Sequence, residues 1–196
     1  MRVVFLDRDG VINKYPGDRE YVTSLVKFKF LPKAKKAIAL LSKAGYKIFV
    51  ASNQAGVGRG IYSQKTLDKI TSFMLLEVKK AGGHIDKVYY CTHHKNAGCS
   101  CRKPKPGMLK KAAREFKINL KKAFFIGDTI RDVFAAKNAG CKSILVFSGK
   151  EKLKNKLKWE VAPDFTFKDL YSAAKYLLKA GGRSPRYHPA LKNTCF

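Results

Sequence analysis

The sequence predicts an α/β domain, in which helices cover both faces of a doubly wound parallel sheet. Short apolar runs alternate with longer amphipathic segments along most of the 196 residues. This alternation is typical of β–α–β units, whose crossover connections produce parallel strands. The length fits one domain, at about 100–200 residues per domain. We therefore expect a single domain over residues 1–180 and a short tail over 181–196.

The first half of the chain contains three predicted strands and two predicted helices. The strands are apolar runs of the kind that is buried on both faces of a parallel sheet. Pro32 suits the first turn of the first helix, while Ser63 caps the second helix and Gly82 ends it. In chain order these elements are Val3–Leu6, Pro32–Ala44, Lys47–Ala51, Ser63–Ala81 and Val88–Tyr90.

The second half continues the same alternation with three helices and two strands. Pro106 marks the start of one helix, and Gly140 follows the end of the next. The expected elements are Pro106–Phe116, Ala123–Ile126, Ile130–Asn138, Ser143–Phe147 and Phe167–Leu178. After Gly181 and Gly182 the chain has two prolines and no clear period, which predicts a mobile tail.

The chain is strongly basic, with 41 Lys and Arg against 14 Asp and Glu and a net charge of +27. Such a charge attracts phosphates, nucleic acid or anionic lipid. Lysines that only solvate the outer faces of helices would give the same total. A hydrophobic content of 45% excludes disorder for most of the chain. The charge therefore suggests an anionic partner but does not distinguish phosphates, nucleic acid and anionic lipid.

Nothing in the sequence predicts a membrane or secretory protein. No run approaches the roughly 18 apolar residues of a membrane span, and the chain opens directly on a predicted strand, without the features of a signal peptide. The five cysteines are odd in number, which argues against a disulfide framework. We expect a cytoplasmic protein with no membrane partner.

Acidic residues follow two of the predicted strands. Asp7 and Asp9 follow the first strand, Asp128 follows Ala123–Ile126, and Asp132 lies one helical turn later. Ligands of α/β sheets bind at the carboxyl ends of the strands. There, one ionised carboxylate can act as a nucleophile, a protonated one as an acid, and several can hold Mg²⁺. Each pair alone also fits an ordinary turn or helix cap.

A loop rich in hydrogen-bond donors follows the strand Lys47–Ala51. It begins Ser52-Asn53-Gln54 and continues through three glycines to Gly60, with Arg59 among them. The hydroxyl, the amides and the backbone N–H groups suit a phosphate, and Arg59 could add a bidentate contact. A merely flexible loop is the alternative.

Three cysteines and a histidine lie close together between residues 91 and 101. Three thiols and an imidazole match a closed tetrahedral zinc site, which predicts a structural ion. The expected zinc ligands are Cys91, His93, Cys99 and Cys101. His94 is an alternative to His93. Arg102 and Lys103 follow directly, between the zinc loop and two prolines that stiffen the backbone.

Together these residues resemble the haloacid dehalogenase (HAD) superfamily of aspartate-nucleophile phosphatases. The resemblance extends from Val3 to about Leu178, and its four motifs match Asp7–Asp9, Ser52, Lys103 and Asp128 in order. It implies a Rossmann-like fold without a large cap domain, and therefore an open site. The Asp-Arg-Asp-Gly sequence, the zinc loop and Cys-Arg-Lys-Pro are similar to the branch of the heptose bisphosphate 7-phosphatases and histidinol-phosphate phosphatases.

The resemblance also implies a role for each residue. Asp7 would be the nucleophile and Asp9 the general acid and base, while Ser52 and Lys103 would hold the phosphoryl group. Mg²⁺ would bind Asp7, the Asp9 backbone carbonyl and Asp128, and Asp132 would orient Lys103 or the metal site. The expected substrate-binding residues are Asn13, Asn53, Gln54, Arg59 and Arg102.

Two motifs favour the heptose branch: Gly56–Gly60, which includes Arg59, and Pro106–Met108. The short gap between His93 and Cys99 resembles the histidinol branch. The expected activity is Mg²⁺-dependent removal of the C7 phosphate of D-glycero-D-manno-heptose 1,7-bisphosphate by a monomer. Alternatives are a histidinol-phosphate phosphatase and, from the basic charge alone, a polynucleotide 3′-phosphatase. A zinc-ordered module that binds nucleic acid would leave the acidic residues at the strand ends unexplained, so we expect at most non-specific binding.

Overall fold

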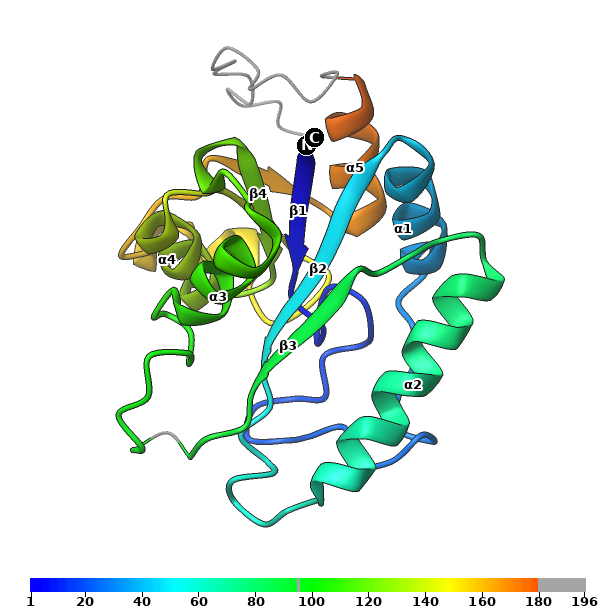
Figure 1. Cartoon of the computed structure of the whole chain (residues 1–196). Coiled ribbons are helices and arrows are strands. Elements are labelled where there is room, and N and C mark those ends of the chain that lie inside the picture. The colour runs from blue at the N-terminus through cyan, green and yellow to red at the C-terminus, as the bar shows by residue number, and fades with distance from the viewer. Residues whose placement is uncertain (95, 180–196) are drawn as a thin grey trace.

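The computed structural model describes residues 1–94 and 96–179, and its sheet confirms the predicted fold class (Figure 1). Six parallel strands lie in the order β3-β2-β1-β4-β5-β6. Their bounds are Arg2–Leu6 (β1), Tyr46–Asn53 (β2), Lys87–Cys91 (β3), Ala123–Gly127 (β4), Lys142–Val146 (β5) and Phe165–Phe167 (β6). The order reverses between β1 and β4, which is where doubly wound sheets form a ligand crevice.

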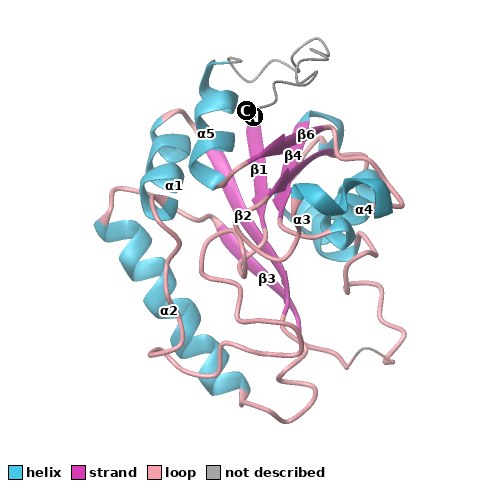
Figure 2. Cartoon of the chain, turned by 180° about the vertical axis from the view of Figure 1, so that it is seen from behind, coloured by secondary structure: helices cyan, strands magenta, loops and turns pink. Residues whose placement is uncertain are grey.

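Helices cover both faces of this sheet (Figures 1 and 2). They are Ala34–Lys43 (α1), Gln64–Lys80 (α2), Gly107–Phe116 (α3), Ile130–Ala139 (α4) and Leu170–Lys179 (α5), with short 3-10 turns at Leu120–Lys122 and Leu153–Lys158. Helices α1, α2 and α5 lie on one face, and α3 and α4 on the other. Successive residues of β1 alternate between the two cores: Val4 and Leu6 face the first, and Val3 and Phe5 the second.

The predicted helix ends are close to the observed ones. The Ser63 hydroxyl accepts a hydrogen bond from the Thr66 N–H at 3.1 Å, as an N-cap does. Gly140 ends α4 with a φ of 79°. In the part of the chain that the structure describes, no helix is long and apolar enough to cross a membrane.

The last part of the fold differs from the prediction. The helix expected over Phe167–Leu178 begins at Leu170, because Phe165–Phe167 instead pairs with β5 as an edge strand. Asp164 fixes this edge, since its carboxylate accepts hydrogen bonds from both the backbone and the hydroxyl of Ser143 at 2.7 Å. Three residues are too few to show a strand period. The expected tail over 181–196 lies outside the described residues.

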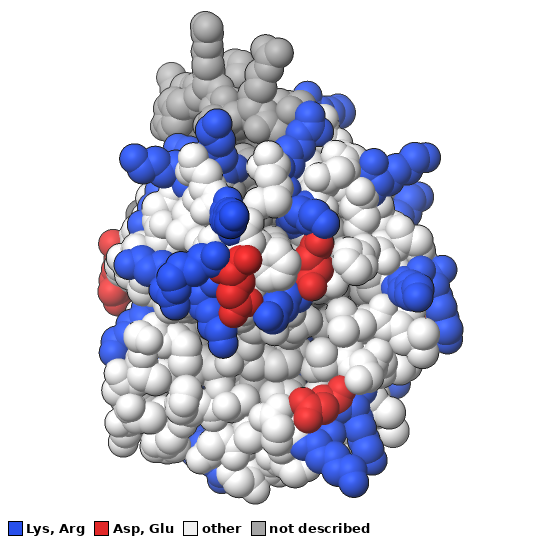
Figure 3. All heavy atoms as spheres, viewed as in Figure 1, with Lys and Arg blue, Asp and Glu red and all other residues white. Residues whose placement is uncertain are grey.

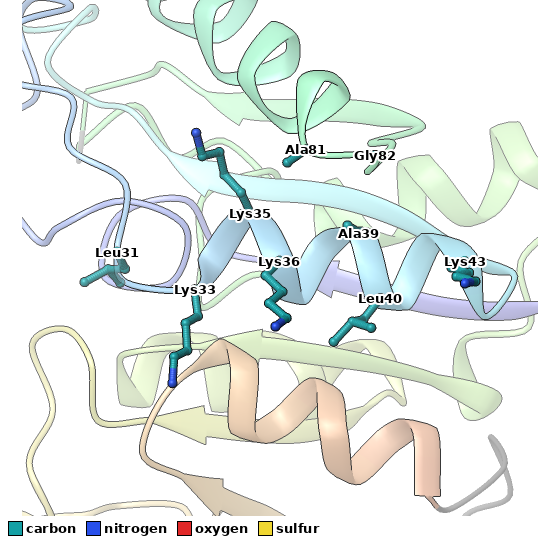
Figure 4. A pocket seen from close by; sticks show the side chains of 9 residues that line it. All are labelled: Leu31, Lys33, Lys35, Lys36, Ala39, Leu40, Lys43, Ala81 and Gly82. Atoms are coloured by element: carbon teal, nitrogen blue, oxygen red, sulfur yellow. The ribbon is translucent and has the colours of Figure 1, made fainter.

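Basic side chains are spread over much of the face drawn in Figure 3 and greatly outnumber the acidic ones there. A groove of about 570 Å³ beside α1 is lined in part by lysines (Figure 4). Lys35 pairs with Glu77 at 3.0 Å, whereas Lys33 and Lys36 lie 5.4 and 5.9 Å from the centre of the Tyr171 ring. This groove shares no residue with the site at the strand ends.

Candidate functional site

Three neighbouring strands bring the predicted catalytic residues together at their carboxyl ends. Leu6 at the end of β1 lies opposite Val50 of β2 and Ile126 of β4. The Asp7 N–H continues the ladder by donating to the Ile126 carbonyl at 2.9 Å. Residues just beyond these positions, including Asp7, Ser52 and Asp128, therefore reach the same edge of the sheet.

Lys103 joins two of the buried carboxylates. Its ammonium nitrogen lies 2.8 Å from Asp7 Oδ2 and 2.6 Å from Asp132 Oδ1, and its side chain is 3% exposed. Asp132 is itself held at the start of α4, where it accepts hydrogen bonds from the backbone N–H and the hydroxyl of Thr129 at 3.0 and 2.7 Å. The ion pair between Asp132 and Lys103 is the contact that we expect if Asp132 orients Lys103.

Asp128 is enclosed by backbone. Its Oδ2 accepts a hydrogen bond from the Lys150 N–H at 2.8 Å. A Cβ added at Gly10 or Gly149 would overlap its carboxylate, so only glycine allows this close approach, and Gly10 also has a φ of +81°. The Ser148 hydroxyl donates to the Gly10 carbonyl at 2.7 Å and so ties the two loops together.

The three carboxylates form an oxygen-rich cluster. One oxygen from each of Asp7, Asp128 and Asp132 lies within 4.8 Å of the others. Burial raises the pKa of Asp7 to about 6, although the Lys103 ammonium lowers it. Burial, together with repulsion from Asp132 and Asp7, raises the pKa of Asp128 well above its usual value. One ammonium therefore does not balance this group of acids, and a hard divalent cation fits the donor set.

The surroundings of Lys103 favour its charged form, whereas those of Asp7 and Asp128 favour the neutral form. Burial lowers its pKa, but the attraction of Asp132 and Asp7 outweighs burial and raises the pKa above its usual value. The side chain therefore stays charged at neutral pH, as a residue that binds a phosphoryl group must.

Asp9 lies beside this cluster and is held by nitrogen donors. Oδ1 accepts hydrogen bonds from Arg8 Nε and Nη2 at 3.1 and 3.0 Å and from Asn13 Nδ2 at 2.9 Å. Oδ2 accepts from Arg8 Nη2 at 3.1 Å and from Gln54 Nε2 at 2.8 Å. The Arg8 side chain is fully buried, whereas that of Asp9 is 20% exposed. The carboxylate is thus both fixed and open to solvent on one side.

The five predicted substrate-binding residues divide into two groups. The amides of Asn13 and Gln54 both donate to Asp9, and the Asn53 amide exchanges hydrogen bonds with the backbone of Lys103 at 3.0 and 3.2 Å. These three amides brace other site residues. Two guanidinium groups remain: Arg59 donates to the Tyr21 hydroxyl at 3.1 Å, and Arg102 has a buried Nη1 without a partner among the described residues.

The structure also gathers the cysteine and histidine residues. Neighbouring donor atoms in the cluster lie 3.2–3.7 Å apart: Cys91 Sγ, His93 Nδ1, Cys101 Sγ and Cys99 Sγ. His94 is outside this cluster, and its Nδ1 accepts a hydrogen bond from the Asn96 N–H. The geometry therefore favours His93 over His94, and the soft donor set suits a tetrahedral metal ion.

This cluster is connected to the loop from Gln54 to Gly60, which is predicted to bind phosphate and is named the phosphate loop. The Gln54 N–H donates to the Cys91 carbonyl at 2.8 Å, and the Gly58 N–H to the Thr92 carbonyl at 2.9 Å. Cys101 is followed directly by Arg102 and Lys103. A metal ion in the cluster would therefore fix the backbone that carries two basic residues of the site.

Some residues of the site were not among those expected from the sequence. Arg8, Thr129 and Lys150 contact Asp9, Asp132 and Asp128. Arg8 could have been noticed as a charge between two aspartates, directly after a strand predicted to be buried. The Lys150 contact uses a backbone N–H, which any residue except proline provides, so no sequence signal marks it.

Known proteins are similar to this chain in sequence. The HAD-hydrolase-like family matches residues 100–173. The D-glycero-β-D-manno-heptose-1,7-bisphosphate 7-phosphatase of Pseudomonas putida is 42% identical over 150 residues, which are 76% of this chain and 85% of that enzyme. The chain belongs to the HAD-like phosphatase family.

Further members of the HAD-like phosphatase family are similar along most of the chain. The D-glycero-α-D-manno-heptose-1,7-bisphosphate 7-phosphatase of Campylobacter jejuni is 38% identical over 151 residues, covering 77% of this chain and 85% of that enzyme. The D,D-heptose 1,7-bisphosphate phosphatase of B. bronchiseptica, crystallised with magnesium and phosphate, matches with a TM-score of 0.85 and 35% identity. That match covers 91% of this chain and 99% of the other.

Proposed function

We propose that this chain is a magnesium-dependent phosphatase that removes the C7 phosphate of D-glycero-D-manno-heptose 1,7-bisphosphate. The observation that carries the proposal is the meeting of Asp7, Lys103, Asp128 and Asp132 where the strand order reverses. The similarity to heptose bisphosphate phosphatases of both anomeric types supports the substrate class.

Asp7 and Asp9 divide the chemistry between them. A carboxylate oxygen of Asp7 attacks phosphorus, the bond from phosphorus to the sugar oxygen breaks, and Asp9 gives that oxygen a proton. Asp9 then takes a proton from a water molecule whose oxygen attacks the aspartyl-phosphate. This second step releases inorganic phosphate and restores Asp7. Ser52 and Lys103 hold the phosphoryl oxygens during both steps.

The acidic cluster is the proposed magnesium site. The side chains of Asp7 and Asp128 and the backbone carbonyl of Asp9 would hold the ion. Mg²⁺ prefers a few carboxylates together with water and phosphate oxygens, which fits this donor set. When bound, Mg²⁺ offsets the negative charge of the transferring phosphoryl group.

We assign the second phosphate of the substrate to Arg102. Its buried Nη1, which has no partner within residues 1–94 and 96–179, is a donor that a phosphate oxygen would satisfy. Arg59, on the loop after β2, would contact the sugar side of the substrate. Asn13 and Asn53 contribute indirectly, because their amides hold Asp9 and the Lys103 backbone.

The proposed ion of the cysteine cluster is a structural zinc held by Cys91, His93, Cys99 and Cys101. Four protein donors close a tetrahedral shell and leave no position for a reacting water molecule. Ligand thiols have to remain reduced, so we place the protein in the cytoplasm. We further propose that it acts as a monomer on its small sugar substrate.

A substrate panel tests the proposed function. The panel contains both anomers of heptose 1,7-bisphosphate, histidinol phosphate and a 3′-phosphorylated oligonucleotide, each assayed for released phosphate with Mg²⁺. We expect the largest kcat/KM for a heptose bisphosphate, with only one phosphate removed. A preference for histidinol phosphate would assign the chain to the other branch. Turnover of the oligonucleotide alone would overturn the proposal.

A further inference from the structure

Gln54 connects Asp9 to a tyrosine that has no role in the proposed chemistry. Its side chain is 1% exposed. Its Nε2 donates to Asp9 Oδ2 at 2.8 Å and to Ser52 Oγ at 3.2 Å, while its Oε1 accepts from the Tyr62 hydroxyl at 2.7 Å. Both ends of the Gln54 amide are thus occupied, so the amide has no free donor for a substrate.

The Tyr62 hydroxyl anchors the oxygen of the Gln54 amide. Because the Asp9 carboxylate only accepts hydrogen bonds, the NH₂ group faces Asp9 and leaves Oε1 to the Tyr62 hydroxyl. Burial raises the pKa of Tyr62 to about 12, so its hydroxyl keeps its proton at neutral pH. Without that hydroxyl Oε1 would be a buried acceptor that has lost its partner, and the amide could shift away from Asp9 to find another.

Tyr62 is itself fixed by packing. It is 7% exposed and lies just before the N-cap of α2. Its ring contacts Gly56 so closely that a Cβ at Gly56 would overlap it, and the Tyr21 ring lies 6.3 Å away. The hydroxyl therefore has a defined position, and the position of the Gln54 amide follows from it.

Among the described side chains that donate hydrogen bonds to Asp9, Gln54 is the one that comes from a different part of the chain. Arg8 and Asn13 belong to the same loop as Asp9 and move with it. Gln54 follows β2, so its hydrogen bond ties the general acid to the phosphate loop. The proton donor and the Ser52 hydroxyl are in this way held by one amide.

We propose that Tyr62 is a positioning residue for Asp9 and acts by fixing the position of the Gln54 amide. The inference rests on the proposed function, because it needs Asp9 to be the general acid and base. Neither residue needs to touch the substrate in this role.

The test compares Tyr62→Phe, Gln54→Leu and the double variant with the unchanged full-length protein on heptose bisphosphate. We expect Tyr62→Phe to lower kcat about tenfold, less than the 10²–10⁴-fold contribution of a complete general acid. KM should stay within about twofold, since substrate contacts are untouched. The double variant should be no slower than Gln54→Leu, because the two residues act in series. Tyr89→Phe is the matched control, since it also loses a hydrogen bond of 2.7 Å, to Glu115, away from the site.

Each outcome has a separate meaning. An inactive unchanged protein would overturn the proposed function and this inference with it. An active protein whose kcat is unaffected by Tyr62→Phe, or whose double variant loses the product of the two single effects, would overturn the inference alone. If Tyr62→Phe fails to fold, Gln54→Leu still decides: a large rise in KM with an unchanged kcat would make Gln54 a substrate contact and refute the positioning role.

Discussion

Asp7, Asp128 and Asp132 are three buried carboxylates, and one ammonium group, that of Lys103, contacts two of them, Asp7 and Asp132. Such a group is costly to keep ionised away from water. The raised pKa values of Asp7 and Asp128 express this cost. A bound divalent cation would offset this repulsion and stabilise the ionised carboxylates.

The first prediction concerns the stability of the magnesium-free protein. The pKa of Asp7 is about 6 in the folded state against 3.8 ordinarily, so its contribution to stability is present below pH 3.8 and lost as the pH rises through 6. This difference corresponds to about 3 kcal/mol. Removing the neighbouring charge in Asp128→Asn should therefore raise the free energy of unfolding at pH 7.5 by about 1–2 kcal/mol.

Urea unfolding without Mg²⁺, at pH 5 and pH 7.5, measures this effect. The gain should be smaller at pH 5, and Mg²⁺ should stabilise the unchanged protein more than the variant. Glu160→Gln, at an exposed carboxylate that has no ion pair among the described residues, is the control and should show neither change. A variant that is destabilised at both pH values would contradict the account.

The second prediction separates the nucleophile from the substrate-binding arginine. Asp7→Asn should have no measurable turnover, because no other group can form the phosphoenzyme. Arg102→Ala should keep a similar kcat on a monophosphate but lose about 2–4 kcal/mol in kcat/KM on the bisphosphate. Steady-state kinetics on both substrates check this. Equal, mild losses in the two variants would refute both assignments.

Much of the acidic cluster could be predicted at the residue level, because carboxylates at the ends of parallel strands must meet. The roles of the amides could not. Asn13, Asn53 and Gln54 have the chemistry of substrate contacts, yet each finds a protein partner within 3.2 Å. Which partner an amide finds depends on loop geometry, and the sequence carries no period for it.

At the level of elements, the cysteine loop and the phosphate loop support each other. Backbone hydrogen bonds from Gln54 and Gly58 reach the carbonyls of Cys91 and Thr92. On the other side, the Gly107 N–H at the start of α3 donates to the Ser100 carbonyl at 3.1 Å. The segment that carries Arg102 and Lys103 is therefore held at both ends.

The third prediction follows from this bracing. Cys99→Ser should lose bound zinc, lower the free energy of unfolding by on the order of 4 kcal/mol, and reduce kcat even at saturating Mg²⁺. Metal analysis, denaturant unfolding and kinetics measure the three effects. Cys141→Ala, at a buried cysteine outside the cluster, should keep its zinc. Full activity in a zinc-free variant would show that the loop needs no ion.

The helices and central strands could be predicted well, since their apolar residues have a clear period. The exception is β6, an edge strand of three residues that the sequence does not predict and whose last residue, Phe167, falls at the start of the predicted last helix. Its pairing with β5 depends on Asp164, whose partner Ser143 is 21 residues earlier. A contact over that distance overrides local preference and leaves no local sign.

The whole molecule is more basic outside than its composition indicates. Of the 14 acidic residues, Asp7, Asp9, Asp128 and Asp132 belong to the site, whereas basic side chains greatly outnumber acidic ones on the face drawn in Figure 3. Such a field attracts doubly phosphorylated substrates from a distance. The charge thus has a use in the proposed reaction that requires no nucleic acid.

The fourth prediction measures this field. Between 50 and 500 mM KCl, kcat/KM for the bisphosphate should fall about three- to tenfold, while kcat changes little, because salt screens the approach and not the bound state. A monophosphate carries less charge and should show a shallower slope. If kcat/KM falls equally with salt for the two substrates, or does not fall, the surface charge does not assist catalysis.

The two glycines that enclose Asp128 limit how this enzyme can diversify. A methyl group at Gly10 or Gly149 would displace the carboxylate, although neither glycine offers a reactive group. A laboratory evolution campaign for new sugar phosphates should therefore find these two positions intolerant. Productive changes should accumulate at the rim instead, around Arg59 and Arg102, where side chains can be exchanged without moving a metal ligand.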